Sequence, residues 1–458
     1  MKQLKINTLQ LSRYLFVAFL ALIFLAKMVQ IELLMYVSIV CGAACLCLSD
    51  DSGRVGICLL LLPNIRMFDG LHVKFLVNIL LVLPVAAYII EHRRVNFIAL
   101  SHVLMLWAWD TSHLLFFNQL TRILPNFSTI IILYYVECVL TDRNTVLDFN
   151  DIARKFSFGC IYSAVVSWMN LAIHISSAYA WNQINAWRLY GYAGDPNYFA
   201  LYIGMSLSMM LLIQGGSRKR DYVYVILLIL LALLTASKMS LGILLFILIF
   251  FAGKALYSFL AQRNKFLRRM TLIGIGAALV FSNQIIDLIN RTLIRLQEYK
   301  GDVVTVDTIT SNRFATNLYY STALIENPAL LILGYGMQYN ELDYFQKIQM
   351  VSHNTFLDLI LSWGLVGVAM ITIILFTIIR QMNRNRREKL NLNHFFPLII
   401  CLLSFLALSC LSSTMFWWVV CAALLPLKGL ENEASAHYRD RTGVQRRKVH
   451  LKVRRVAH

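Results

Sequence analysis

The chain has 458 residues, of which 59% are hydrophobic and only 14% are charged, with a formal net charge of +18. A soluble domain carries about a quarter charged residues, so this composition excludes an ordinary soluble enzyme. The positive charge lies in short breaks between apolar stretches, as in the loops of a membrane protein, and we expect no nucleic-acid partner.

Apolar stretches of about 15 to 25 residues recur along the chain, and a helix needs ~20 residues to cross the hydrocarbon core. Helices are expected because a lone strand leaves its backbone groups unsatisfied in lipid. We therefore predict an all-α polytopic membrane protein with about 12–14 transmembrane helices. The expected spans are residues 11–29, 32–49, 55–68, 74–91, 95–117, 122–140, 156–180, 196–214, 221–237, 239–259, 268–288, 355–380, 396–411 and 413–428.

Two of these spans have alternative interpretations. The first one follows Lys2, Lys5 and Arg13 and resembles a signal peptide, but no small-residue cleavage site comes after it. It is therefore predicted to stay as the first helix. The third is short and contains Pro63 and Arg66, so a re-entrant segment is the alternative there.

The basic residues predict the orientation of the chain. If the N-terminus lies inside and the spans alternate, 31 of the 42 Lys and Arg residues fall in inner segments. The positive-inside rule favours this arrangement, with both termini cytoplasmic. The division is residues 1–289 as a transmembrane bundle, 290–353 as an outer loop, 354–430 as further transmembrane helices and 431–458 as a basic cytoplasmic tail.

The outer loop, residues 290–353, is the only long polar segment between expected spans. Loops of this length are usually functional or disordered. Thr310-Ser311-Asn312 can cap a helix that runs through Leu318, Tyr319 and Leu324 and ends at Asn327-Pro328. We predict a short amphipathic helix that lies on the membrane surface or packs over the bundle.

Few cations fall on the predicted outer side, so each one is a candidate for function. Arg188 lies in the shorter outer loop, and Gly194-Asp195-Pro196-Asn197 follows it as a helix start. The motif is either a plain helix cap or an anion site at a helix N-terminus, where free N–H groups attract phosphate. Lys238 occupies a tight outer turn, where it either snorkels or faces an outer cavity.

The long loop supplies the other candidates. Arg313 begins the predicted loop helix, where a solvated position is the alternative. His353 and Asn354 begin the next span; the histidine is either a base or phosphate partner, or a bystander beside a cap formed by Ser352 or Asn354.

No pair of outer carboxylates has metal-ligand spacing, and the nine cysteines lie in or beside apolar stretches without a CxxC pair. The cysteines are interpreted as small hydrophobic residues. The expected site holds neither a metal nor a cofactor and receives an anionic, membrane-embedded substrate.

Several motifs between residues 180 and 370 resemble those of one family. They are Arg188 with Gly194-Asp195-Pro196-Asn197, then Ser237-Lys238, then Arg313 with Glu326-Asn327-Pro328 and Leu333-Gly334-Tyr335-Gly336, and finally His353-Asn354-Thr355-Phe356-Leu357-Asp358 with Gly364-Leu365-Val366-Gly367. Their order is similar to that of the O-antigen ligase and O-antigen polymerase superfamily of bacterial membrane glycosyltransferases. The family more often has Ser-Arg where this chain has Ser237-Lys238, and lysine lacks the bidentate fork.

The resemblance implies a GT-C-like helical bundle with a long extracytoplasmic loop in the bacterial cytoplasmic membrane. It implies metal-independent, inverting glycosyl transfer from undecaprenyl pyrophosphate. Arg188, Arg313 and Lys238 would bind the pyrophosphate, and His353 with Arg313 would serve the reacting centre. Asp195, Asn197 and Asn354 would support them.

Three functions are consistent with these features. A polymerase would join lipid-linked repeat units of a capsule, exopolysaccharide or O-antigen, and it is preferred. A ligase would transfer the same donor glycan to a lipid or protein acceptor. A flippase or transporter would need charged residues along a path through the spans, where only Arg66 and Asp110 are candidates. The expected partners are donor and acceptor glycans and membrane lipids. A protein that regulates chain length is a further candidate partner.

Overall fold

The computed structural model describes residues 2–68, 75–173, 189–213, 219–235, 237–260, 313–337, 339, 352–385, 392–411 and 415–428. In these ranges every regular element is helical. The elements are α1 (Lys2–Val29), α2 (Glu32–Leu48), α3 (Asp51–Leu61), η1 (Leu62–Phe68), α4 (Phe75–His92), α5 (Phe97–Phe116), η2 (Leu120–Arg122), α6 (Ile123–Ile130), α7 (Ile132–Thr141), α8 (Phe149–Ile173), α10 (Pro196–Met210), α11 (Lys219–Leu234), α12 (Lys238–Leu260), α16 (Arg313–Glu326), α17 (Pro328–Leu333), α18 (Thr355–Asn385), η5 (Leu392–Phe395), α19 (Phe396–Phe405) and α20 (Met415–Lys428).

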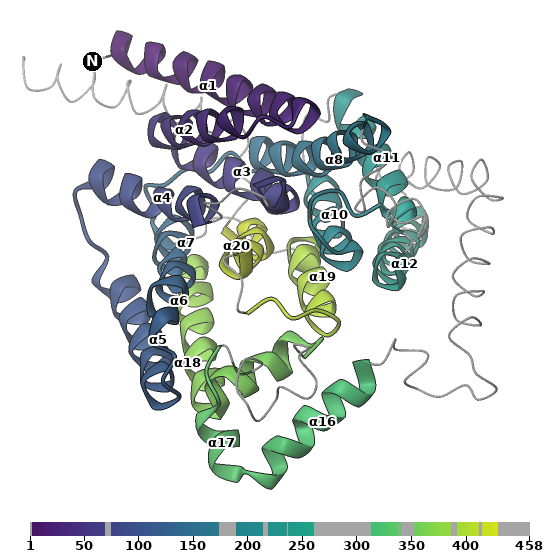
Figure 1. Cartoon of the computed structure of the whole chain (residues 1–458). Helices are drawn as coiled ribbons and strands as arrows, with labels where there is room; N and C mark the ends of the chain where they lie inside the picture. The colour runs from purple at the N-terminus through teal and green to yellow at the C-terminus, as the bar shows by residue number, and fades with distance from the viewer. Residues whose placement is uncertain are drawn as a thin grey trace, which may run out of the picture.

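Four helical stretches in the described ranges are long and apolar enough to cross a membrane. They are Gln10–Val29, Leu120–Thr141, Phe149–Ile173 and Thr355–Asn385. Shorter apolar helices, such as Glu32–Leu48 and Met415–Lys428, pack beside them (Figure 1). The structure is therefore that of an all-α protein with membrane-spanning candidates, in agreement with the predicted class.

Several predicted spans differ from the observed helices. The expected span 122–140 is divided at Ile131 into α6 and α7, and α8 begins at Phe149 rather than at 156. The short third span is the buried helix α3 followed by the 3-10 helix η1. The expected span 268–288 lies outside the described residues.

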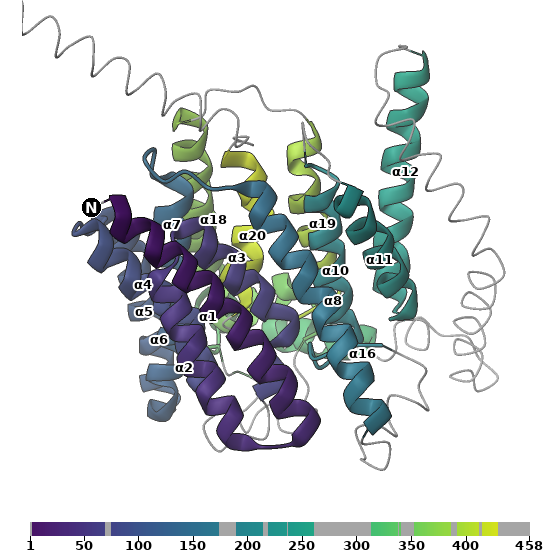
Figure 2. The same cartoon turned by 90° about the horizontal axis from the view of Figure 1, so that it is seen from above.

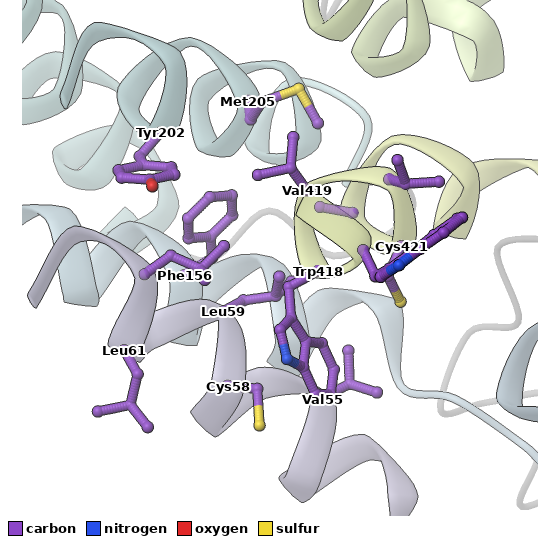
Figure 3. Packing of buried hydrophobic residues seen from close by; sticks show 14 of the residues in the cluster. Val55, Cys58, Leu59, Leu61, Phe156, Tyr202, Met205, Trp418, Val419 and Cys421 are labelled. Atoms are coloured by element: carbon purple, nitrogen blue, oxygen red, sulfur yellow. The ribbon is translucent and has the colours of Figure 1, made fainter. Parts of the chain in front are cut away.

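The core lies where α3, α8, α10 and α20 meet (Figure 3). The backbones of α3 and α8 approach each other closely in this core, because a Cβ on Gly159 of α8 would lie 2.7 Å from the carbonyl oxygen of Leu60 in α3. The Asn64 amide donates to the Gly159 carbonyl at 3.0 Å and so ties η1 to α8. Helices pack this closely where small residues face each other. The core therefore fixes η1 against the start of α10.

Ion pairs gather at the end of the bundle where α18 finishes. Arg154 forms two hydrogen bonds with Asp221, at 2.9 and 3.0 Å, and Arg54 pairs with Glu91 at 2.8 Å. Lys428 donates to backbone carbonyls at the end of α7, including that of Asp142 at 3.1 Å. A cation at a helix C-terminus compensates the helix dipole. Cations at this end therefore serve to join helices.

The helix predicted in the long loop is confirmed. Helix α16 ends at Glu326, and α17 begins at Pro328, as the Asn327-Pro328 stop predicts. Its predicted cap, residues 310–312, lies outside the described residues. Helix α16 runs across the bundle at the end where α12 begins (Figures 1 and 2). One face packs on the bundle, because Tyr320, Ala323 and Leu324 are buried.

Candidate active site

The turn before α10 is built for close contact with a cation. Asp195 caps α10 by accepting a hydrogen bond from the Asn197 amide at 2.7 Å, and Pro196 occupies the first turn, as predicted. Gly194 has a φ of +84°, and a Cβ on it would lie 2.0 Å from the Nε of Arg66. Only glycine fits this position. The Arg66 side chain therefore lies directly against the Gly194-Asp195 turn.

A second cation approaches the same turn from α1. The Nζ of Lys27 lies 5.6 Å from the ring centroid of Tyr192, within cation–π range. Burial raises the pKa of Tyr192 to about 12, so its ring stays neutral. The backbone joins the elements as well, because the Arg66 amide donates to the Tyr192 carbonyl at 3.1 Å. Cations from α1 and η1 thus flank the start of α10.

The sequence did not identify these two residues as members of the site. Lys27 stands at the end of an expected span, and Arg66 stands in the short third span and is a candidate for a transport path. Both reach the turn across long sequence separations, for which a single sequence carries no pairing signal. The only hint was the glycine at 194, since a φ above zero often accompanies a close neighbour.

The turn containing Ser237 and Lys238 docks on the same helix start. The Ser237 hydroxyl donates to Oδ1 of Asn197 at 2.6 Å. The Leu189 amide donates to the Leu234 carbonyl at 3.0 Å, so the two chain segments also meet through their backbones. Lys238 is exposed and begins α12. The structure therefore brings Asp195, Asn197 and Lys238 together, while Arg188 lies outside the described residues.

His353 lies between two anchored neighbours at the start of α18. Asn354 is the cap, because its Oδ1 accepts from the amides of Phe356 at 2.9 Å and Leu357 at 3.2 Å. The Ser352 amide donates to the hydroxyl of Tyr339 at 2.9 Å. His353 itself is half-buried. Because Ser352 and Asn354 are both held by hydrogen bonds, the backbone position of His353 is fixed.

A buried carboxylate continues this network into the bundle. Asp358 is 1% exposed and accepts a hydrogen bond from the Ser409 hydroxyl at 2.6 Å. It also accepts from Tyr339, and burial together with this carboxylate raises the pKa of Tyr339 above its ordinary value. Tyr339 therefore stays protonated and remains a donor. Buried polar groups are stable only when satisfied in this way.

The segment after α19, which contains Ser409, bonds to α10 as well as to Asp358. Tyr198, three residues after Asp195, donates to the carbonyl of Ser409. Thr355 donates to the carbonyl of Leu408. The path Tyr198–Ser409–Asp358–Tyr339–Ser352 thus connects the start of α10 to the residue before His353. The start of α10 and the start of α18 are therefore joined by one hydrogen-bonded framework.

The glycine motifs hold the loop against a break in α18. Gly364 has φ 64° and ψ −171°, so the helical backbone is interrupted there. The amides of Tyr335 and Gly336 donate to the freed carbonyls of Leu361 and Ser362, each at 2.7 Å. Gly334 touches Gly364, since a Cβ on it would lie 2.5 Å from the Gly364 nitrogen. The break and the Gly334-Tyr335-Gly336 turn are one structural unit.

The remaining candidates are Arg313 in the long loop and Asp110 in α5. Arg313 is the first residue of α16, and its side chain lies outside the described residues. Asp110, the other candidate for a transport path, is wholly buried. Its carboxylate accepts hydrogen bonds from the indole Nε1 of Trp363 at 2.9 Å and from the side-chain amide of Asn126 at 2.8 Å. It therefore joins α5 and α6 to the break in α18.

Comparison with known proteins adds nothing to this geometry: no family model matches the chain, and no curated protein or solved structure matches it either.

Proposed function

We propose that the protein is a polymerase of lipid-linked glycan repeat units, acting at the outer face of a bacterial cytoplasmic membrane. The observation that carries the proposal is the framework from the α10 start to Ser352. It joins the helix start beside Arg66 and Lys27 to the residue before His353, at one end of the bundle. Transfer from a lipid diphosphate needs these two things: charge for the leaving group and a group that can move a proton.

In the proposed reaction, an acceptor hydroxyl attacks the anomeric carbon at the reducing end of the donor glycan. The bond from that carbon to the diphosphate oxygen breaks, and the lipid diphosphate leaves. Arg66 and Lys27 flank the α10 N-terminus, where the positive end of the helix dipole also favours phosphate. With Lys238, and with Arg188 and Arg313, they would neutralise the leaving group, while His353 takes the proton of the hydroxyl.

The orientation belongs to the same proposal. The ion pairs of Arg54 and Arg154 lie at the end where α18 finishes, and that end carries the basic segments. By the positive-inside rule this would be the cytoplasmic end. The candidate site would then face outward, where lipid-linked glycans are assembled. The GT-C-like architecture is proposed on the resemblance of the motifs.

A gel of the surface glycan tests the proposal in the native host. His353→Ala and Arg313→Ala should abolish long chains and leave single repeats attached to the final acceptor. Arg220→Ala, which changes a half-exposed arginine at the opposite end, should leave the pattern unchanged. Long chains retained on the carrier lipid with no attachment would identify a ligase instead. An unchanged glycan in both site variants would refute the catalytic assignment.

A further inference from the structure

Helices α16 and α17, residues 313–333, form an elbow that exposes four large apolar side chains on its outer side, where the hydroxyl of Thr322 is bonded within the helix. Leu318 and Ile325 are 55% and 74% exposed, and they stand seven residues apart, two turns along the same side of α16. Tyr320 on the other side is fully buried. We call the exposed row Leu318, Ile325, Ile332 and Leu333 the outer stripe. A helix apolar on both sides has a second apolar environment besides the bundle.

The outer stripe is continuous with the side of α5. At the end of α5, Leu115 and Phe116 are 61% and 80% exposed, as expected of side chains that face lipid. The next residue, Phe117, stacks on Tyr335 with ring centroids 6.3 Å apart. Tyr335 stands two residues after the end of α17, and Phe117 packs on the cluster that contains Tyr335, Tyr320 and Leu324, so the surfaces of α5 and the elbow adjoin.

The level of the elbow along the bundle agrees with a lipid environment. In Figure 2, the α1–α2 turn and the end of α8 extend farther along the bundle than α16 does. In Figure 1, the elbow lies along one edge of the described part of the bundle. Among the described side chains of the elbow, Glu326 is the only charged one. A water-facing rim helix would carry more charge.

We propose that the outer stripe is seated in the acyl region of the membrane leaflet nearest the candidate site. The elbow is then an interfacial anchor, with Tyr320 and Tyr339 against the bundle and the outer stripe against lipid. Apolar helical faces of this kind are buried at the boundary of headgroups and acyl chains. The proposal holds whatever the chemistry of the site, because it depends only on exposure and placement.

The test uses single cysteines in liposomes of phosphatidylcholine and phosphatidylglycerol. Ile325→Cys and the matched control Glu326→Cys are made in full-length protein with Cys41 and Cys47 changed to Ser, since the other cysteines are buried. A water-soluble maleimide should label position 325 at least about tenfold more slowly than position 326, because apolar surroundings disfavour the thiolate. Equal rates in folded protein would overturn the proposal.

A second measurement identifies what covers the stripe. A bimane fluorophore at position 325 should be quenched by phosphatidylcholine that carries a nitroxide on its acyl chain, and more strongly than bimane at position 326. Ready formation of a 325–325 disulfide between two chains, without quenching by lipid, would show that a second copy covers the stripe and would overturn the proposal.

Discussion

The two halves of the candidate site are held by different kinds of contact. The half at α10 consists of a capped helix start, the glycine turn at Gly194 and cations that arrive from α1 and η1. The half at α18 consists of buried hydrogen bonds around Asp358 and a backbone contact between two glycines. The charged side chains of the first half, such as Arg66 and Lys238, are exposed, so they can be substituted without disturbing the core. The buried groups of the second half, Asp358 and the two glycines, cannot be changed without affecting the fold.

The largest effect is expected at His353, which lies at the start of the second half outside its buried hydrogen bonds. His353→Ala should lower the rate of glycan transfer by about 100- to 10,000-fold, the usual contribution of an acid–base group. The thermal unfolding midpoint should stay close to that of the wild type, because Ser352 and Asn354 keep their own hydrogen bonds. Transfer can be measured with purified lipid-linked repeat units. A variant that melts early would mean that His353 is structural.

Gly364→Ala tests the second half through its backbone. A methyl group there would lie 2.1 Å from the carbonyl oxygen of Ile332, at a φ of 64°. We expect a loss of about 2–4 kcal/mol in unfolding free energy, from left-handed strain and steric overlap. Gly242→Ala in α12 is the matched control, since no heavy atom lies within 4 Å of its added Cβ. Similar stabilities for the two variants would contradict the packed contact.

Arg66→Ala tests the first half through its charge. If Arg66 binds the lipid diphosphate, kcat/KM should fall about 10- to 100-fold, as for a lost charged hydrogen bond. Arg66→Lys should recover part of the loss, since it restores charge but not the fork. Arg220→Ala at the opposite end is the control. The assignment is wrong if Arg66→Ala and Arg220→Ala have the same kcat/KM.

The smallest effect is expected at the joint between α10 and α12. Ser237→Ala removes the donor to Asn197 and should cost about 1 kcal/mol of stability, while Lys238 keeps its charge. Chemical denaturation in detergent measures the difference. Thr322→Ala, which removes an exposed hydroxyl bonded within α16, is the control. A large loss of activity with no loss of stability would show that Ser237 touches substrate.

Local signals predicted the local parts of the site. The Asp195-Pro196 helix start and the end of α16 before Asn327-Pro328 were predicted and are confirmed, and of the two residues considered for the cap of α18, Ser352 and Asn354, the structure has Asn354. Each depends on backbone groups within a few residues of one another, for which side-chain type is a direct guide.

Contacts between distant segments were not predicted. Arg66 meets Gly194, and Tyr198 reaches the carbonyl of Ser409, across separations that no local pattern encodes. The break at Gly364 was also missed, because an apolar run predicts one continuous span even where the helix is interrupted. The start of α8 was also predicted too late. The charge of Arg154 indicated a loop, but Arg154 lies within α8 and pairs with Asp221.

The hydrogen bond between the Ser352 amide and the Tyr339 hydroxyl has a further consequence for the position of His353. This 2.9 Å contact ties the residue before His353 to a side chain thirteen positions earlier in the chain. The entropy of closing a loop changes only slowly with its length. The tie between Tyr339 and Ser352 should therefore tolerate an inserted epitope tag between these two residues, with His353 kept in place.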